Sequence, residues 1–300
     1  MIDFLPINID HRDEIIKIIS KNEQETSDFS FANLFAWSDK FLSVFAIIEN
    51  SFFAKTNCCS EKSCYMFPIG EMDLKKAVPM LLDDAKERNH KFSMIGITQE
   101  MWEQINSIFP NKFSYFPDRN LSEYVYLSEN LINLKGSKLQ SKRNHINNFK
   151  KENPSWYYKR INDKNGINEC LKMLNSWEVS EKERLSASQY AEYYAVKKML
   201  ENYEELFLTV AAIFVDNNIV AFTIGERLNK DTFIVHCEKA YTNIKGTYTI
   251  INQQFIENEA SNFTYVNREE DLGIEGLRKA KNSYYPIKLI QKGNVELNSI

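Results

Sequence analysis

The densest run of residues that could do chemistry is NREED, at residues 267–271. We expect a strand over 263–269 that ends inside this run, and in open α/β sheets ligands bind at the carboxyl ends of strands. Asn267 and Glu269 would share one face of the strand, because side chains alternate between its faces. Glu269 could accept a proton in acid–base catalysis, and Asp271 follows at the end of the strand.

A helix expected over 274–283 carries further charge into the same region. Arg278, Lys281 and Tyr285 are spaced i, i+3, i+7, so they can share one helix face. Together with Asp271, the arginine and the lysine could hold an ester-linked donor and stabilise the oxyanion of acyl transfer. The alternative is a structural ion-pair network that joins the helix to the sheet.

The strand expected over 231–240 offers a second pair of polar residues. His236 and Glu238 would lie on one face, since they are two residues apart. Glu238 could act as a general base or hold an attacking amine. Alternatively, Glu238 simply pairs with a lysine or an arginine.

A basic segment covers residues 135–151, with six basic residues, one histidine and no acid. The basic residues are Lys135, Lys138, Lys142, Arg143, Lys150 and Lys151. We expect a helix over 135–153 that places Lys135, Lys138 and Lys142 on one face. Such charge suits an RNA acceptor end, an anionic lipid or a phosphorylated cofactor, bound through counterion release. Lys142, Arg143, Asn144 and His145 are the candidate contacts, and a solvated helix face is the alternative.

A loop at residues 242–248 precedes a helix expected over 246–260. The amino end of a helix carries positive partial charge and exposed N–H groups that bind phosphate. Gly246, Thr247 and Tyr248 are therefore candidate binding residues. A single glycine before a helix is also typical of a simple cap or turn.

Length, composition and charge limit the class of protein to which these candidate residues belong. The chain has 300 residues, is 43% hydrophobic and holds only 9 Gly and 7 Pro, which excludes a disordered or collagen-like protein. A net charge of −4 excludes a uniformly basic nucleic-acid coat. Residues 1–134 carry 13 basic and 20 acidic residues, whereas residues 135–300 carry 24 and 21. We therefore expect two domains, at 1–132 and 133–300.

The start of the chain has neither the positive charges nor the apolar run of a secretory signal, and no stretch approaches the roughly 20 apolar residues that cross a bilayer. The five cysteines, an odd number, favour a reducing cytoplasm, with the membrane periphery as a further possible location. Cys58, Cys59 and Cys64 lack a fourth ligand at suitable spacing, and the four histidines are scattered. We expect no metal and no permanently bound cofactor.

The expected elements make a mixed sheet with helices on its faces, an α/β (α+β) fold. Further helices are expected at 10–21, 28–37, 74–89, 99–109, 166–178 and 188–202, and further strands at 42–48, 51–55, 92–97, 122–127, 156–161, 206–215, 219–227 and 287–292. Glu49-Asn50 and residues 216–218 are expected hairpin turns.

The order hairpin, strand, helix, strand, helix, strand in the second half resembles the Gcn5-related N-acyltransferase (GNAT) fold. Three stretches of sequence carry a more specific resemblance: LKGSKLQSKRNHINNF (134–149), HCEKAYTNIKGTYTIINQQF (236–255) and YVNREEDLGIEGLRKAKNSYYP (265–286). They resemble the bacterial family called phosphatidylglycerol lysyltransferase C-terminal domain, formerly DUF2156. The resemblance implies two GNAT-like domains in tandem, and similarity to the Fem-type aminoacyltransferases.

The resemblance also implies a reaction. Better-characterised members transfer an amino acid from aminoacyl-tRNA to a lipid headgroup, so we expect direct acyl transfer to an amine or hydroxyl acceptor, a lipid headgroup or a small molecule. An acyl-CoA-dependent N-acetyltransferase and a non-catalytic module that binds tRNA or anionic lipid are the alternatives. The expected catalytic residues are Glu238, Glu269, Asp271 and Arg278, and the expected binding residues are Lys142, Arg143, Asn144, His145, Gly246, Thr247, Tyr248, Asn267 and Lys281.

Overall fold

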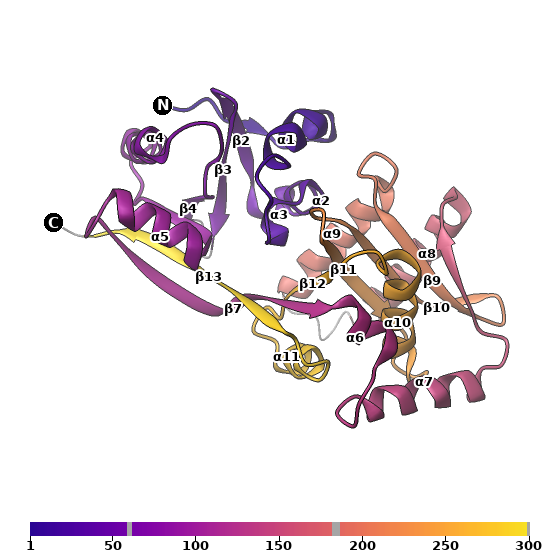
Figure 1. The fold of residues 1–300 in the computed structure, drawn as a ribbon. Coiled ribbons are helices and arrows are strands. Elements are labelled where there is room, and N and C mark those ends of the chain that lie inside the picture. The colour runs from indigo at the N-terminus through magenta and orange to yellow at the C-terminus, as the bar shows by residue number, and fades with distance from the viewer. Residues whose placement is uncertain (59–61, 182–186, 299–300) are drawn as a thin grey trace. The chain divides into compact units, whose positions relative to one another are not determined.

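The computed structural model describes residues 1–58, 62–181 and 187–298. Its elements, drawn in Figure 1, form a mixed α/β fold, which confirms the expected class. The chain divides into two compact units. Unit 1 comprises Met1–Glu123, Glu270–Glu275 and Leu289–Ile300, and unit 2 comprises Tyr124–Glu269 and Gly276–Lys288.

The sheet of unit 1 has the strand order β1-β2-β3-β4-β6-β13-β7, and β5 pairs with β3. These strands are β1 (Leu5–Pro6), β2 (Val44–Ile48), β3 (Ser51–Cys58), β4 (Lys62–Tyr65), β5 (Ile69–Gly70), β6 (Ser93–Thr98), β7 (Phe113–Leu127) and β13 (Lys288–Leu297). The expected hairpin at Glu49-Asn50 is confirmed: both residues have positive φ, 48° and 55°, and Ile48 pairs with Ser51. Such turns match the twist of the flanking strands.

Unit 1 contains seven helical segments within the described residues. They are η1 (Ile9–His11), α1 (Arg12–Ile19), η2 (Ser27–Phe29), α2 (Phe31–Ala36), α3 (Ser38–Phe41), α4 (Leu74–Glu87) and α5 (Gln99–Ile108). In α1 the buried residues are Ile15, Ile18 and Ile19, at helical spacing. Asp73 caps α4 by accepting a hydrogen bond from the Lys75 amide at 2.8 Å.

Unit 2 has the strand order β12-β11-β10-β9-β8, in which only β11 and β12 pair in parallel. Its elements are α6 (Ser128–Asn133), α7 (Gln140–Glu152), β8 (Tyr157–Ile161), α8 (Lys164–Glu181), α9 (Ala187–Glu201), β9 (Thr209–Val215), β10 (Asn218–Arg227), β11 (Thr232–Ala240), α10 (Thr247–Glu259), β12 (Tyr265–Glu270) and α11 (Glu275–Asn282). Helix α10 connects the parallel strands and packs on the sheet and on α6 and α7. Along the chain, the hairpin of β9 and β10 is followed by β11, α10, β12, α11 and β13, which is the order of elements expected from the sequence.

The basic helix begins later than expected, at Gln140 instead of residue 135. Leu134 and Gly136 have positive φ, 49° and 86°, which a right-handed helix does not accommodate. Lys135 and Lys138 therefore precede α7, and the prediction that they share a helix face with Lys142 is wrong.

The division into units also differs from the expected boundary between residues 132 and 133. Strand β7 is longer than expected, and its residues up to Glu123 belong to unit 1 while those from Tyr124 belong to unit 2. Strands β12 and β13 likewise contribute residues to both units. The division at 132/133 as a boundary between domains stays a prediction.

No helix in the described ranges is both long enough and apolar enough to span a bilayer. Nor do those ranges contain a cluster of His, Cys, Asp and Glu that could hold a metal ion. Cys170 and Cys237 are free and buried. Cys64 takes part in a disulfide, which an odd cysteine count does not predict, and Cys59 lies outside the described residues.

Candidate functional site

A buried ion pair lies at the centre of the candidate site in unit 2. Glu238 stands on β11 and Arg268 on the neighbouring parallel strand β12. Arg268 Nη2 donates to Glu238 Oε2 at 2.5 Å, and the side chains are 11% and 10% exposed. Asn252, on α10, donates from Nδ2 to Glu238 Oε1 at 2.8 Å. Glu238 thus pairs with an arginine, and both of its carboxylate oxygens have donors.

Two tyrosine rings flank the guanidinium of Arg268. The Arg268 Cζ atom lies 5.6 Å from the ring centroid of Tyr126 and 5.0 Å from that of Tyr284. Tyr126 donates from its hydroxyl to the Lys281 carbonyl oxygen at 2.8 Å, which fixes its ring. A cation held between aromatic faces is stabilised by the ring quadrupoles and keeps a defined orientation.

Lys142 brings a second positive charge to the Tyr284 ring. Its ammonium Nζ lies 4.0 Å from the ring centroid, on a side chain from α7. Burial, and secondly the charge of Arg268, lower the pKa of Lys142 from 10.5 to about 8, while Glu238 acts in the opposite direction. Near neutral pH a fraction of the Lys142 side chains is therefore a neutral amine, which can accept a proton.

Two polar atoms beside Glu238 lack a hydrogen-bond partner among the described residues. They are Arg268 Nη1, a donor, and Asn252 Oδ1, an acceptor, and both are buried. Leaving such atoms unpaired costs free energy, so native structures hold few of them. We call the group formed by Lys142, Glu238, Asn252, Arg268 and Tyr284 the Glu238 cluster. It contains one donor and one acceptor whose hydrogen-bonding capacity is unused among the described residues.

His236 lies between two carboxylates and away from this cluster. Its Nε2 is 3.0 Å from Glu226 Oε1 and its Nδ1 is 2.8 Å from Glu269 Oε1. The pairing of β10 with β11 shifts by one residue here, because Ile224 faces Cys237 while Gly225 faces Val235. This β-bulge breaks the alternation of side chains. The prediction that His236 and Glu238 share one face is therefore wrong: they contact Glu269 and Arg268, two successive residues of β12.

His236 is expected to make stability depend on pH. Burial alone would lower its pKa, but the hydrogen bonds to Glu226 and Glu269 raise it from 6.5 to about 9. Its stabilising contribution is therefore complete below pH 6.5 and is lost as pH rises through 9. Urea unfolding at pH 6 and pH 9.5 should show a loss on the order of 3 kcal/mol that His236→Gln lacks. An equal pH dependence in the variant would contradict this account.

Asn267 and Lys281 hold the end of β12 in place. Asn267 is fully buried and accepts from the Glu269 amide at 2.8 Å, where Glu269 has a φ of 54°. Lys281 is 8% exposed and donates to the carbonyl oxygens of Arg268, at 2.5 Å, and of Glu269, at 3.2 Å. Lys281 therefore joins α11 to β12 through backbone hydrogen bonds.

Asp271 and Arg278 are the remaining predicted catalytic residues. Asp271 belongs to unit 1, is fully buried and accepts from Arg119 Nη1 at 3.4 Å and from the Gly273 amide at 2.9 Å. Arg278 is half-buried on α11. Tyr285 lies beyond the end of that helix with a φ of 55°, so the prediction that it shares a helix face with Arg278 and Lys281 is wrong.

The other residues predicted on the basic helix have different surroundings from Lys142. Arg143 donates from Nη1 to the carbonyl oxygens of Leu134 and Gly136, the latter at 2.8 Å, and so holds the turn before α7. Asn144 and His145 are exposed on α7. The structure thus brings only Lys142 of this group to the Glu238 cluster.

Gly246 is required by close packing of α10 against α7. Its φ is 87°, and a Cβ there would lie 2.6 Å from the His145 carbonyl oxygen and 3.1 Å from the Phe149 Cβ. Thr247 is buried and donates from its hydroxyl to the Ile244 carbonyl oxygen, whereas Tyr248 is 41% exposed. The glycine therefore makes room for a helix, which is a different role from a backbone cradle for a pyrophosphate.

Four residues of this region were not predicted from the sequence as site residues: Asn252, Arg268, Tyr126 and Tyr284. Arg268 stands in the polar run of β12, and its alternation with Asn267 placed it on the opposite face of the strand. The two tyrosines and Asn252 come from three other segments, which are β7, α10 and the turn after α11, so no local spacing connects them. An arginine within a buried strand was the signal available, since such a residue is almost always paired.

The chain resembles a known family over nearly its whole length. The family model described as "Phosphatidylglycerol lysyltransferase, C-terminal" matches residues 20–292. A Bacteroides thetaiotaomicron structure of unknown function is 38% identical, with a TM-score of 0.93 over 99% of this chain and all of that one. L-PGS from Bacillus licheniformis has 14% identity and a TM-score of 0.66 over 96% and 93% of the two chains, and so shares the fold.

A curated relative is an uncharacterised protein of Mycoplasmoides gallisepticum, 27% identical over 175 residues. The match covers 57% of this chain and 54% of that protein. The chain therefore spans about half the length of the curated relative it matches.

Proposed function

Because the chain belongs to the phosphatidylglycerol lysyltransferase C-terminal family, we propose that it is an acyltransferase that moves an aminoacyl group from aminoacyl-tRNA to an amine or hydroxyl acceptor. A lipid headgroup is the acceptor that the family description favours, and a small molecule is the other class. The observation that carries the proposal is Lys142, an amine whose pKa is lowered to about 8, beside the buried and incompletely paired Arg268.

The proposed reaction needs a proton acceptor and a positive charge at the carbonyl oxygen. Neutral Lys142 takes the proton as the acceptor's nitrogen or oxygen bonds to the ester carbonyl carbon. Arg268 stabilises the oxyanion through Nη1, the donor that has no partner among the described residues. The bond between the carbonyl carbon and the ribose oxygen then breaks. Lys142 returns its proton to that departing oxygen, which becomes the ribose hydroxyl. No covalent intermediate with the enzyme is formed.

Glu238 and Asn252 act as positioning residues in this scheme. The two bonds to the Glu238 carboxylate hold the Arg268 guanidinium and the Asn252 amide in place. Asn252 Oδ1 would accept a hydrogen bond from the ammonium group of the aminoacyl moiety. Glu269, Asp271 and Arg278 stay proposed catalytic residues. They rank after Lys142 and Arg268, since Glu269 pairs with His236 and Asp271 pairs with Arg119.

The proposed donor site includes the exposed lysines of the basic segment. Lys135, Lys138, Lys150 and Lys151 are exposed, and a polyanion would gain from counterion release on binding them. The double variant Lys138→Gln/Lys151→Gln is expected to bind tRNA more weakly and to lower the slope of log affinity against log salt by about 2, or about 1 per lost phosphate contact. Fluorescence anisotropy with labelled tRNA measures this slope, and an unchanged slope would show that these lysines are merely solvated.

An acyl-CoA donor is the second candidate, and the packing at Gly246 disfavours it. A pyrophosphate needs the backbone N–H groups at the start of α10 to be approachable, whereas α7 packs against Gly246. A non-catalytic module that binds tRNA or anionic lipid is the third candidate. A non-catalytic module has no function for the lowered pKa of Lys142.

Incubation with charged tRNA separates the three candidates. Bulk tRNA carrying radiolabelled amino acids is mixed with the protein and with phosphatidylglycerol vesicles or a panel of amines, and acetyl-CoA replaces the tRNA in a parallel reaction. We expect label to leave the tRNA and appear in lipid or in a small-molecule product. Label transferred only from acetyl-CoA would support the second candidate. Binding of tRNA without loss of label would support the third.

A further inference from the structure

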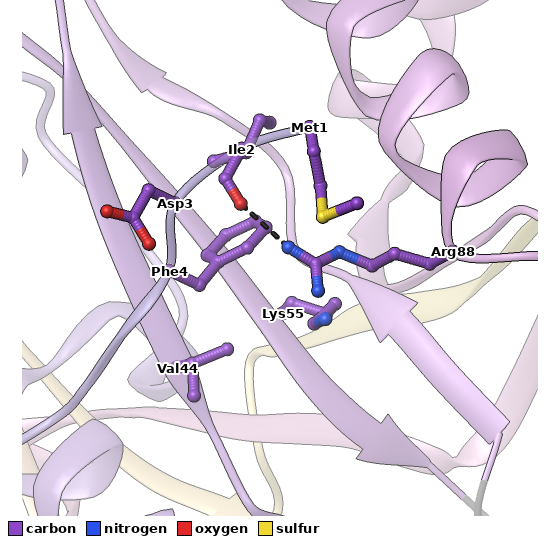
Figure 2. Close-up of a pocket in the computed structure, with 7 residues that line it drawn as sticks. All are labelled: Met1, Ile2, Asp3, Phe4, Val44, Lys55 and Arg88. Atoms are coloured by element: carbon purple, nitrogen blue, oxygen red, sulfur yellow. Dashed lines mark hydrogen bonds between the residues drawn. The ribbon is translucent and has the colours of Figure 1, made fainter.

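Unit 1 contains a pocket of about 450 Å³, lined by the segment Met1–Phe4 together with Val44, Lys55 and Arg88. Figure 2 shows Phe4 at its centre, with Lys55 and Arg88 on the same side of the ring. None of these residues belongs to the Glu238 cluster, and the proposed transfer reaction uses none of them. The size of the pocket is that of a small-ligand site.

Two cationic side chains, those of Lys55 and Arg88, line this pocket. The Lys55 Nζ lies 5.2 Å from the ring centroid of Phe4, and the Arg88 Cζ lies 5.8 Å from it. Arg88 Nη2 donates to the Ile2 carbonyl oxygen at 2.7 Å. In Figure 2 the other terminal nitrogen of Arg88 points toward the Lys55 ammonium. Hydrogen-bond donors of two positively charged groups therefore converge on one region.

The carboxylates around the pocket compensate only one of these charges. Asp84 is fully buried and accepts from Arg88 Nε at 2.9 Å, from the Tyr65 hydroxyl at 2.7 Å and from the Ile2 amide at 2.8 Å. Asp3 lines the pocket, but its carboxylate is directed away from both cations in Figure 2. Within the described residues, no carboxylate is close enough to Lys55 to form an ion pair with it.

The charged form of Lys55 is destabilised in this pocket, and a bound anion would stabilise it. Burial lowers its pKa below the ordinary value, and the charge of Arg88 lowers it further, while Asp84 acts in the opposite direction. A neighbouring anion favours the charged form of a lysine. Phe4 and Val44 provide apolar surface beside the two cations, which an alkyl or aryl body would cover.

We propose that this pocket binds a small organic anion, with a carboxylate or phosphate head at Lys55 and Arg88 and an apolar body against Phe4 and Val44. A neighbouring pocket of about 370 Å³ shares Met1, Ile2 and Asp3, but its other lining residues are Glu14 and apolar side chains. With no basic residue in its lining, that pocket does not suit an anion. The proposed anion site is thus specific to the side that carries Lys55 and Arg88.

Isothermal titration calorimetry with three six-carbon probes tests this site. Hexanoate carries a carboxylate, hexyl phosphate a phosphate, and hexanol the same chain without charge. We expect at least one anion to bind with saturation at one site per chain, and at least tenfold more tightly than hexanol. The preferred head identifies the source, since a carboxylic acid favours hexanoate and a phosphate ester favours hexyl phosphate.

Two lysine variants locate the binding. Lys55→Gln is expected to weaken anion binding about tenfold or more, the usual effect of losing one charge-assisted hydrogen bond. Lys75→Gln removes the same charge from an exposed position of unit 1 and should leave the affinity unchanged. Failure of both anions to bind, binding of hexanol as tight as that of the anions, or full affinity in Lys55→Gln would overturn the proposal.

The wild-type protein provides a further test that does not depend on the folding of a variant. Anion affinity should fall as pH rises through the lowered pKa of Lys55, because the neutral amine no longer attracts the anion. Lys55→Arg keeps its charge over this range and should bind the anion at all pH values tested. An affinity that is independent of pH in the wild-type protein would contradict the role of Lys55.

Discussion

Arg268→Ala is expected to lower the free energy of unfolding by about 3–5 kcal/mol and to remove transfer activity, because it leaves the Glu238 carboxylate buried without its charged partner. Asn252 would be the remaining side-chain donor to that carboxylate among the described residues. Urea denaturation followed by circular dichroism measures the loss, with Arg227→Ala as the matched control. Arg227 is exposed at the end of β10, and its replacement should cost less than about 1 kcal/mol.

A double variant separates the stability of the pair from its chemistry. Arg268→Met combined with Glu238→Leu removes both charges and fills similar volume, so it should recover most of the stability lost by Arg268→Ala. Transfer activity should stay absent, because the charge proposed at the oxyanion is gone. A double variant as unstable as Arg268→Ala would show that the cost comes from packing. An active double variant would remove Arg268 from the mechanism.

Lys142→Met is expected to lower the transfer rate by about 10²–10⁴-fold, the usual contribution of general acid–base catalysis, while keeping the protein folded. In the wild-type enzyme the rate should rise with pH through the Lys142 pKa of about 8 and level off above it, since only the neutral amine accepts a proton. Single-turnover transfer from charged tRNA between pH 6 and pH 9.5 measures this profile. Transfer at the wild-type rate in Lys142→Met would contradict the assignment.

Two controls accompany this prediction. Lys142→Arg keeps the positive charge but cannot lose its proton in this range, so it should retain tRNA binding and lose the pH-dependent limb of the rate. The pKa of Lys142 is lowered in the folded chain, so the stability penalty of Lys142 is present below pH 8 and diminishes as pH rises toward 10.5. Lys142→Met should therefore melt at a higher temperature than the wild-type protein at pH 7. Lower activity with higher stability is a signature of a functional residue.

Local patterns in the sequence were sufficient to predict most of the elements. The turn at Glu49-Asn50 depends on a few neighbouring residues, and it lies where the pattern indicates. The start of α7 was predicted wrongly, because the charge pattern of residues 135–151 does not reveal the positive φ of Leu134 and Gly136. Glycine permits this backbone conformation but does not require it.

The candidate site was harder to predict, because it depends on contacts between distant segments. Lys142 and Glu238 were selected separately from the sequence, and they reach one cluster only through the pairing of β11 with β12 and the packing of α7 and α10. The bulge at His236 cannot be deduced from a period-2 pattern, and it moves His236 and Glu238 to different partners. Lys281 donates to the backbone carbonyl oxygens of Arg268 and Glu269, and neither its charge nor its spacing on the helix predicts these contacts.

The most direct test of the proposed function is the rate at which labelled aminoacyl groups leave charged tRNA in the presence of phosphatidylglycerol vesicles. It compares the wild-type protein, Lys142→Met and the exposed-site control Lys172→Met under single-turnover conditions. We predict transfer of label to lipid by the wild-type protein and by Lys172→Met, and a rate lower by about 10²-fold or more in Lys142→Met. Equal rates in all three proteins, or no transfer by the wild-type protein to lipid or to any amine tested, would contradict the proposal that the Glu238 cluster catalyses aminoacyl transfer.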